Sequence, residues 1–249
     1  MRSREAKMSE NKNISNVSEG IGHQTTMYRT SWKNNNFFKL TKILEEIGKN
    51  FYSRGWVLGT SGNFSAVISR EPLCLAITST GSDKGKLTLA QFLEIDGAGN
   101  VVGGSCDGDD RQPSAEAALH LAIVRCTDAN AVLHTHSIWS TVLSDMHASE
   151  GSIVLEGYEM LKGLEGVKTH QHKEYLPILE NSQDMIELAQ RVTATLHEHD
   201  GIRGFLLRGH GFYTWGASLE EAKHNVEILE FLMEVLVRSA QAQGRAVSL

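Results

Sequence analysis

The spacing of apolar residues changes sharply early in the chain, and this change constrains the fold more than any other feature. Over residues 37–51 apolar side chains recur every three or four positions, as on one buried face of an α-helix. After Gly55 they come instead in short runs, at 63–69, 73–78 and 92–96, between clusters of Gly and Asp. We therefore expect a helix followed by several short β-strands.

Helical and strand-like patterns continue to alternate over the rest of the chain. The expected helices are 113–125, 137–146, 159–164, 181–198 and a last one that begins at Ser218 with a capping box. The expected strands are 131–136, 153–155, 175–179, 205–208 and 211–215. Residues 97–111, with five glycines, are expected to form a surface loop. The mixture predicts an α/β fold with a central mixed, mostly antiparallel β-sheet covered by helices on both faces.

The composition excludes several classes of protein. With 249 residues, 41% of them hydrophobic, the chain can bury one full core, and no apolar run is long enough to span a bilayer. The net charge of −6 argues against nucleic-acid binding, which depends on neutralising phosphates. The three cysteines form no C-x-x-C pair, which favours a reducing, cytoplasmic location. Residues 1–32 are polar and have no signal-peptide core, so we expect a flexible leader before a single domain at 33–249.

Two histidines stand two positions apart at the end of an apolar run. His134 and His136 follow the run 131–133, and in a strand such residues project from the same face. Imidazole nitrogen is a preferred zinc ligand, although iron, manganese and cobalt also accept it, and a zinc site needs at least a third protein ligand. The best candidate is His210, which also lies at a strand end, between two glycines. An ordinary pair of polar residues at a strand end is the alternative interpretation.

Several loops of small residues are candidates for an anion site. Residues 60–63 read Thr-Ser-Gly-Asn, and residues 79–82 read Ser-Thr-Gly-Ser with Lys84 close behind. Backbone N–H groups in such turns form concave anion sites, and hydroxyls and an ammonium add further donors. Ser114 at an expected helix start offers helix amides in addition. Taken singly, each loop is equally typical of a plain turn or helix cap.

The acidic candidates and the remaining histidines are less distinctive. Glu116 lies in the first turn of an expected helix, and Glu159 opens the segment Glu-Met-Leu-Lys-Gly, but position alone selects neither. His170 and His172 repeat the two-residue spacing in a polar stretch, which suits either the mouth of a site or solvent. His120 is expected to be a helix-surface or packing residue.

The ordered set of motifs resembles the class II aldolase/adducin family. The matching blocks are Thr-Ser-Gly-Asn at 60–63, Thr-Ser-Thr-Gly at 78–81, Pro-Ser-Ala-Glu at 113–116, His-Thr-His at 134–136 and Gly-His-Gly at 209–211. The likeness runs from about residue 36 to residue 240. It implies a three-layer fold and a zinc-dependent lyase that forms an enediolate from a small phosphorylated ketose. Further blocks at 159–163, 175–178, 181–184 and 210–216 indicate a dehydratase within the family.

The resemblance also implies roles for individual residues. His134, His136 and His210 would bind one Zn²⁺ per subunit, and Glu159 would transfer a proton. Glu116 matches the base of the family's aldolases, so either glutamate could take the first proton. The residues that match the phosphate cradle are Gly62, Asn63, Thr80, Gly81 and Ser114. The family commonly forms homotetramers with sites between subunits, so a complete site here would need a neighbour.

Two alternatives stay open from the sequence. An aldolase or 4-epimerase that acts on fuculose- or ribulose-type phosphates would use the same metal and enediolate, and the aldolase would break C3–C4. A non-catalytic scaffold of the adducin type would act in protein binding. The Glu159 block favours the dehydratase over the aldolase, and the three histidines argue against a scaffold, which has no chemical need of them.

Overall fold

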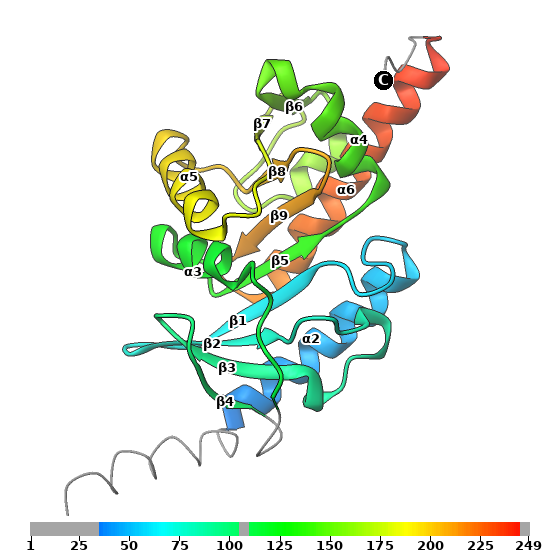
Figure 1. Cartoon of the computed structure of the whole chain (residues 1–249). Helices are drawn as coiled ribbons and strands as arrows, with labels where there is room; N and C mark the ends of the chain where they lie inside the picture. The colour runs from blue at the N-terminus through cyan, green and yellow to red at the C-terminus, as the bar shows by residue number, and fades with distance from the viewer. Residues whose placement is uncertain (1–34, 105–109, 245–249) are drawn as a thin grey trace, which may run out of the picture.

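The computed structural model describes residues 35–104 and 110–244, and within them nine strands form one sheet (Figure 1). The strand order is β4-β3-β2-β1-β5-β9-β8-β7-β6. The strands are β1 (Asn63–Arg70), β2 (Leu73–Thr78), β3 (Phe92–Asp96), β4 (Val101–Gly104), β5 (Ala131–Thr135), β6 (Ser152–Glu156), β7 (Lys173–Leu179), β8 (Gly204–Leu207) and β9 (Gly211–Gly216). Only β7 and β8 pair in parallel, so the predicted mixed, mostly antiparallel sheet is confirmed. The expected leader at 1–32 lies outside the described residues.

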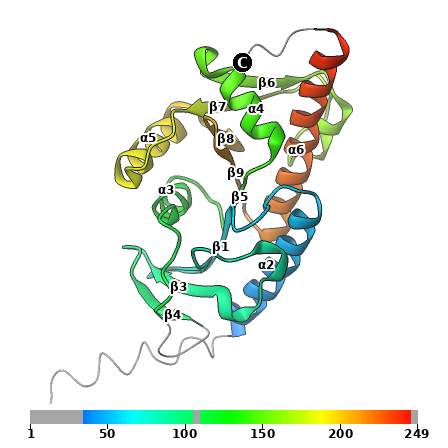
Figure 2. The ribbon, with the colours of Figure 1, turned by 45° about the vertical axis from the view of Figure 1, so that its right-hand side comes forward.

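Five α-helices of the described chain cover the two faces of this sheet. They are α2 (Asn35–Ser53), α3 (Ala117–Cys126), α4 (Ile138–Met146), α5 (Met185–Glu198) and α6 (Leu219–Ala242). Short 3-10 helices are η2 (Lys84–Lys86), η3 (Leu89–Gln91), η4 (Ala148–Glu150) and η5 (Glu159–Gly163). Figure 2 shows α3 and α5 on one side of the sheet, with α2 and α6 on the other. The molecule therefore has the three layers that the family resemblance implies.

The central strand β5 divides the core between the two faces. Ala131 and Leu133 pack with α2 and the start of α6, whereas Val132 packs with α3 and α5. Side chains alternate along a strand, so His134 shares the face of Val132 and points to the α3 side. Because β5 lies between β1 and β9 and all its residues are buried, the histidine is held by a rigid part of the molecule.

Two elements differ from the sequence predictions near the sheet edge. Residues 97–111 were expected to form a loop, but Val101–Gly104 form β4, because they complete the hydrogen bonding of β3. The helix expected from Pro113 begins only at Ala117. Pro113 instead pairs with Ser79 in an isolated bridge, which keeps the segment before α3 extended beside the end of β2.

Two further differences concern helix type and helix capping. The expected helix at 159–164 is the five-residue 3-10 helix η5 rather than an α-helix. The cap of α5 is Asp184 and not Asn181, because the Asp184 carboxylate accepts hydrogen bonds from the backbone N–H groups of Ile186 and Glu187. At α6 the Ser218 hydroxyl accepts from the Glu221 N–H, as the predicted cap requires.

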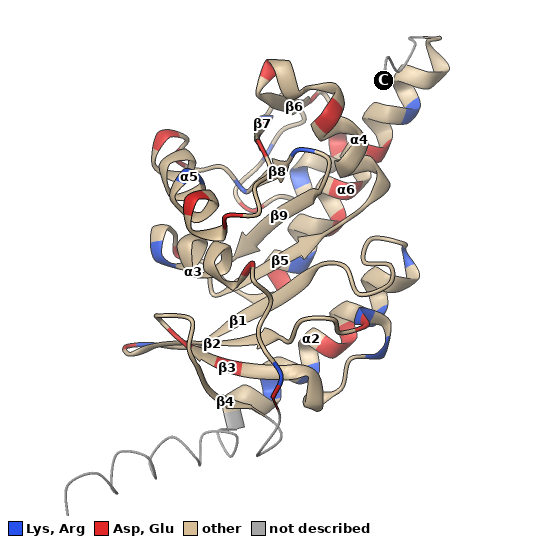
Figure 3. Ribbon diagram, in the orientation of Figure 1, with Lys and Arg blue, Asp and Glu red and all other residues tan. Residues whose placement is uncertain are grey.

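The exposed helix faces carry charges of both signs. Figure 3 shows acidic and basic residues interleaved along α2, α5 and α6. Pairs one turn apart join them, such as Lys223–Glu227 at 3.8 Å and Arg238–Glu234 at 2.6 Å. Such pairs support solvated helix surfaces only modestly. Among the described helices, none combines the length and apolar character that crossing a membrane requires.

Candidate metal centre and active site

Strand β5 and the turn before β9 bring three imidazoles together. The Nε2 atoms of His134 and His136 lie 2.8 Å apart, and His210 Nε2 lies 3.4 Å from the former and 3.1 Å from the latter. A tetrahedral zinc ion with Zn–N bonds of about 2.0–2.1 Å would hold two ligand nitrogens roughly 3.3 Å apart. The three nitrogens therefore surround a position that fits one metal ion.

The protonation of the histidines suits metal binding. His134 Nδ1 lies 3.0 Å from the Phe212 carbonyl oxygen, to which its N–H donates, so the lone pair is on Nε2. Burial lowers the pKa of His134 well below its usual range and lowers that of His136 to about 4. Burial also lowers the pKa of His210. All three rings are thus neutral near pH 7, as a metal ligand must be.

Three glycines allow the turn and the close approaches that form the cluster. Gly209 has φ +60, which turns the chain between β8 and β9 and presents His210. A Cβ on Gly211 would collide with the Thr135 carbonyl oxygen, and one on Gly62 would lie 2.5 Å from the His134 carbonyl oxygen. Gly62 therefore packs directly against the ligand strand, which is a structural reason for glycine at this predicted phosphate-site position.

Glu116 lies beside the three histidines. Its Oε1 is 3.3 Å from His210 Nε2 and 3.7 Å from His134 Nε2, and its side chain is 16% exposed. Asn63 Nδ2 donates to Glu116 Oε2 at 2.5 Å and lies 3.3 Å from Ser114 Oγ. The structure thus brings three more of the predicted site residues, Glu116, Asn63 and Ser114, into contact at the cluster.

Two buried rings, Tyr213 and His120, contact residues of this cluster. Neither was expected there from the sequence. Tyr213 stacks on His134 with centroids 3.9 Å apart, and its pKa is raised well above the usual value by burial and then by nearby Glu116. His120 is fully buried and contacts Asn63 and Ser65. One signal was available for His120: it follows Glu116, the residue just before α3, by four positions, a spacing that brings two side chains to the same side of a helix.

The small-residue loops meet next to the cluster. The Thr80 N–H donates to the Gln112 carbonyl at 2.9 Å, which ties the loop at 79–82 to the segment before α3. Lys84 is buried, and its Nζ donates to the Thr60 carbonyl at 3.1 Å and the Ser82 carbonyl at 2.7 Å. Burial lowers the pKa of Lys84 to about 8, and the charge of Glu116 is near enough to act on it. A cationic side chain is therefore held between the loops.

Within one chain, Glu159 does not join this cluster. Its side chain is 71% exposed and pairs with Lys162 at 2.6 Å and with His170 at 3.8 Å. The hydrogen bond from Lys162 lowers the pKa of Glu159. A single chain therefore holds Glu159 in an environment that favours its charged form. Met160 beside it is also exposed, whereas Leu161 is buried.

A buried carboxyl supports the ligand strand from the opposite face. Glu230 on α6 accepts a hydrogen bond from the Thr135 hydroxyl at 2.7 Å, and Thr135 stands between His134 and His136. Burial raises the pKa of Glu230 to about 7. The strand end is therefore tied to α6 as well as to its neighbours in the sheet.

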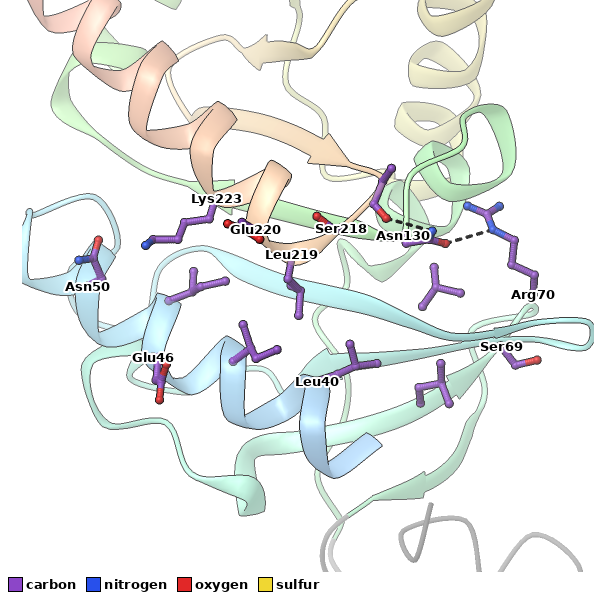
Figure 4. A pocket seen from close by; sticks show the side chains of 15 residues that line it. Leu40, Glu46, Asn50, Ser69, Arg70, Asn130, Ser218, Leu219, Glu220 and Lys223 are labelled. Atoms are coloured by element: carbon purple, nitrogen blue, oxygen red, sulfur yellow. Dashed lines mark hydrogen bonds between the residues drawn. The ribbon is translucent and has the colours of Figure 1, made fainter. Parts of the chain in front are cut away.

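A separate cavity lies away from the histidines. It has a volume of about 960 Å³ and is lined by α2, β1 and the start of α6, including Leu40, Arg70, Leu219 and Lys223 (Figure 4). None of the predicted site residues lines it.

Comparisons with known proteins agree with this geometry. The family model described as class II aldolase and adducin N-terminal domain matches residues 42–237. The methylthioribulose-1-phosphate dehydratase of Methylococcus capsulatus is 43% identical over 196 residues, which cover 78% of this chain and 91% of that protein. The dehydratase of the same name from Azotobacter vinelandii is 40% identical, with 83% and 97% covered. The crystal structure of L-fuculose-1-phosphate aldolase from Thermus thermophilus superposes with a TM-score of 0.66 at 25% identity, covering 84% of this chain and 100% of that one.

Proposed function

The chain belongs to the class II aldolase and adducin family, and from this membership we propose that it is a methylthioribulose-1-phosphate dehydratase. The observation that carries the proposal is the meeting of three neutral imidazoles with Glu116, in a chain about 40% identical to dehydratases over nearly their whole length. The proposal includes zinc as the metal, one ion per subunit, a homotetramer, and a cytoplasmic role in methionine salvage.

The substrate poses a defined chemical problem. In 5-methylthioribulose 1-phosphate the C3 proton lies next to the C2 carbonyl and is only weakly acidic, and its removal places negative charge on oxygen. A divalent ion held by His134, His136 and His210 supplies Lewis-acid stabilisation of that charge. The protein must then provide a base for the C3 proton, an acid for the departing C4 hydroxyl and a cradle for the phosphate.

Glu116 is the base in this proposal. Its Oε1 lies 3.3 Å from His210 Nε2, which places this carboxylate beside a ketose bound at the histidines. Removal of the C3 proton gives the enediolate, and expulsion of the C4 hydroxyl as water gives an enol that tautomerises to the 2,3-diketone phosphate. Among the described residues, no other carboxylate is paired with these histidines.

Glu159 is the acid, and a second copy of the chain provides it. Its exposed position, and the absence of any ion pair between it and His134, His136 or His210 of the described chain, support a role across a subunit boundary. Burial between two subunits would remove Glu159 from water and disfavour its charged form, which raises the pKa of a carboxyl group. It could then protonate the leaving C4 hydroxyl.

The phosphate is proposed to bind between the small-residue loops. Gly62, Asn63, Thr80, Gly81 and Ser114 are the residues assigned to this cradle. The bond between the Thr80 N–H and the Gln112 carbonyl, with the bridge from Ser79 to Pro113, supports a shared concavity of these loops. Lys84 adds a positive charge within it.

The alternative is an aldolase, which the likeness to the fuculose-1-phosphate aldolase favours. Purified metal-loaded protein incubated with 5-methylthioribulose 1-phosphate distinguishes the two by mass spectrometry. The dehydratase gives a diketone phosphate that has lost one water. An aldolase would break C3–C4 and give dihydroxyacetone phosphate with methylthioacetaldehyde. Cleavage products without the diketone, or no turnover, would overturn the proposal.

A further inference from the structure

A row of buried polar groups runs behind Glu116, away from the histidines. Ser65 Oγ lies 2.7 Å from His120 Nδ1, His120 Nε2 contacts Asn63 Oδ1, and Asn63 Nδ2 lies 2.5 Å from Glu116 Oε2. Ser65 and His120 are fully buried, and Asn63 is 3% exposed. We propose that Ser65 and His120 are positioning residues that act through Asn63 to hold the Glu116 carboxylate for proton transfer. This inference rests on the proposed function.

The direction of each hydrogen bond in the row follows from the chemistry of its ends. An ionised carboxylate can only accept, so Asn63 must turn its NH2 group to Glu116 and its carbonyl oxygen to His120. His120 must then donate from Nε2, which leaves Nδ1 to accept from the Ser65 hydroxyl. Burial lowers the pKa of His120 to about 3, so the ring is neutral and carries one proton, as this pattern needs.

The order of donors matters because the Asn63 amide could otherwise rotate. A rotated amide would place its carbonyl oxygen against the Glu116 carboxylate, and two acceptors at 2.5 Å repel each other. With its proton on Nε2, His120 would face the NH2 group of a rotated amide with a second donor, so this tautomer favours the orientation that Glu116 requires. With Oε2 held in this way, Oε1 is directed to His210 at 3.3 Å, the side on which the substrate would bind.

The elements that carry the row explain its rigidity. Asn63 and Ser65 are two positions apart on β1 and share a face, and Glu116 and His120 lie four apart at the start of α3. Asn63 is also the β-sheet partner of His134, across β1 and β5. The row thus joins the helix that carries the base to the strand pair that carries a metal ligand.

The test compares His120→Leu with His120→Gln. Leucine has no N–H, whereas the glutamine amide can place an N–H near the position of Nε2. We expect kcat of His120→Leu to fall about 10- to 100-fold, the scale of a misplaced catalytic group, with KM and metal content near the wild-type values. His120→Gln should recover most of this loss. Ser65→Ala, which keeps the ring and should leave folding intact, is expected to show a smaller fall in kcat.

A double-mutant cycle separates positioning from general packing. In a Glu116→Gln background the base is absent, so adding His120→Leu should lower kcat little further. An equal loss in both backgrounds, or unchanged kcat in both His120→Leu and Ser65→Ala, would overturn the positioning role while the dehydratase assignment stands. An inert wild-type protein overturns the dehydratase assignment, and the positioning role is lost with it.

Discussion

Two carboxylates of this chain lie in opposite environments. Glu116 is 16% exposed, contacts two histidines and is held by Asn63. Glu159 is 71% exposed, and within the described residues it pairs with its helix neighbour Lys162 and with His170. The difference shows that one chain gathers Glu116 with three imidazoles, which we call the enclosed part of the site, and leaves Glu159 in solvent. In the proposed function Glu159 completes the site of a second chain.

The largest effect is expected in the enclosed part, from His134→Ala. This ring is fully buried, and its Nε2 lies near both other ligands. Two remaining imidazoles should not hold zinc tightly, so metal content should fall from one ion per subunit to a small fraction, with loss of turnover. Elemental analysis of the purified variant measures this. His224→Ala, at an exposed histidine on α6, is the matched control. Full zinc occupancy in His134→Ala would contradict the ligand assignment.

The next largest effect is expected from replacing each of the two carboxylates, and it tests whether they act in the same chain. Glu116→Gln and Glu159→Gln should each keep their metal and lose about 100-fold or more in kcat, the scale of acid–base catalysis. If Glu159 serves a neighbour's site, mixing the two inactive variants through unfolding and refolding should restore activity in about a quarter of the sites of a randomly assembled oligomer. Mixtures that stay as inactive as their components would place both groups in one chain's site.

A smaller effect, on substrate affinity, is expected from Lys84→Met in the proposed phosphate cradle. Its ammonium is buried between the small-residue loops, so its loss should raise KM for the phosphorylated ketose about 10-fold, as loss of a charge-assisted hydrogen bond does. Because burial lowers the pKa of Lys84 to about 8, the wild-type kcat/KM should fall as pH rises through that value. The variant should lack this fall. A KM equal to that of the wild type would remove Lys84 from phosphate binding.

The smallest expected effect is on the stability of the folded protein and comes from Glu230, which contacts β5 from α6. Burial raises the pKa of Glu230 to about 7, above its value in the unfolded chain, so the folded protein keeps this proton longer as pH rises. The associated stability is present below the unfolded pKa and is lost as pH rises through about 7. Glu230→Gln should therefore show a smaller fall in Tm between pH 5 and pH 8 than wild type, measured by calorimetry. Equal falls would show that Glu230 does not titrate as proposed.

The sequence predicted the pair of histidines on β5 and the sheet because both depend on local patterns. The period of two along 131–136 fixes that His134 and His136 share a face, whatever lies around them. It did not predict β4, because Val101–Gly104 is glycine-rich and becomes a strand only through pairing with β3. It also did not predict the delayed start of α3, which depends on the bridge from Pro113 to distant Ser79.

The sequence by itself determined which residues could do chemistry: the three imidazoles, the two glutamates and the small-residue loops. Only the tertiary structure decided which of them meet. It placed Glu116 against the histidines, left Glu159 in solvent and buried His120 behind Asn63. The physical reason is that side-chain direction follows from local backbone geometry, whereas contact between β1, α3 and β9 depends on how the whole sheet and its helices pack.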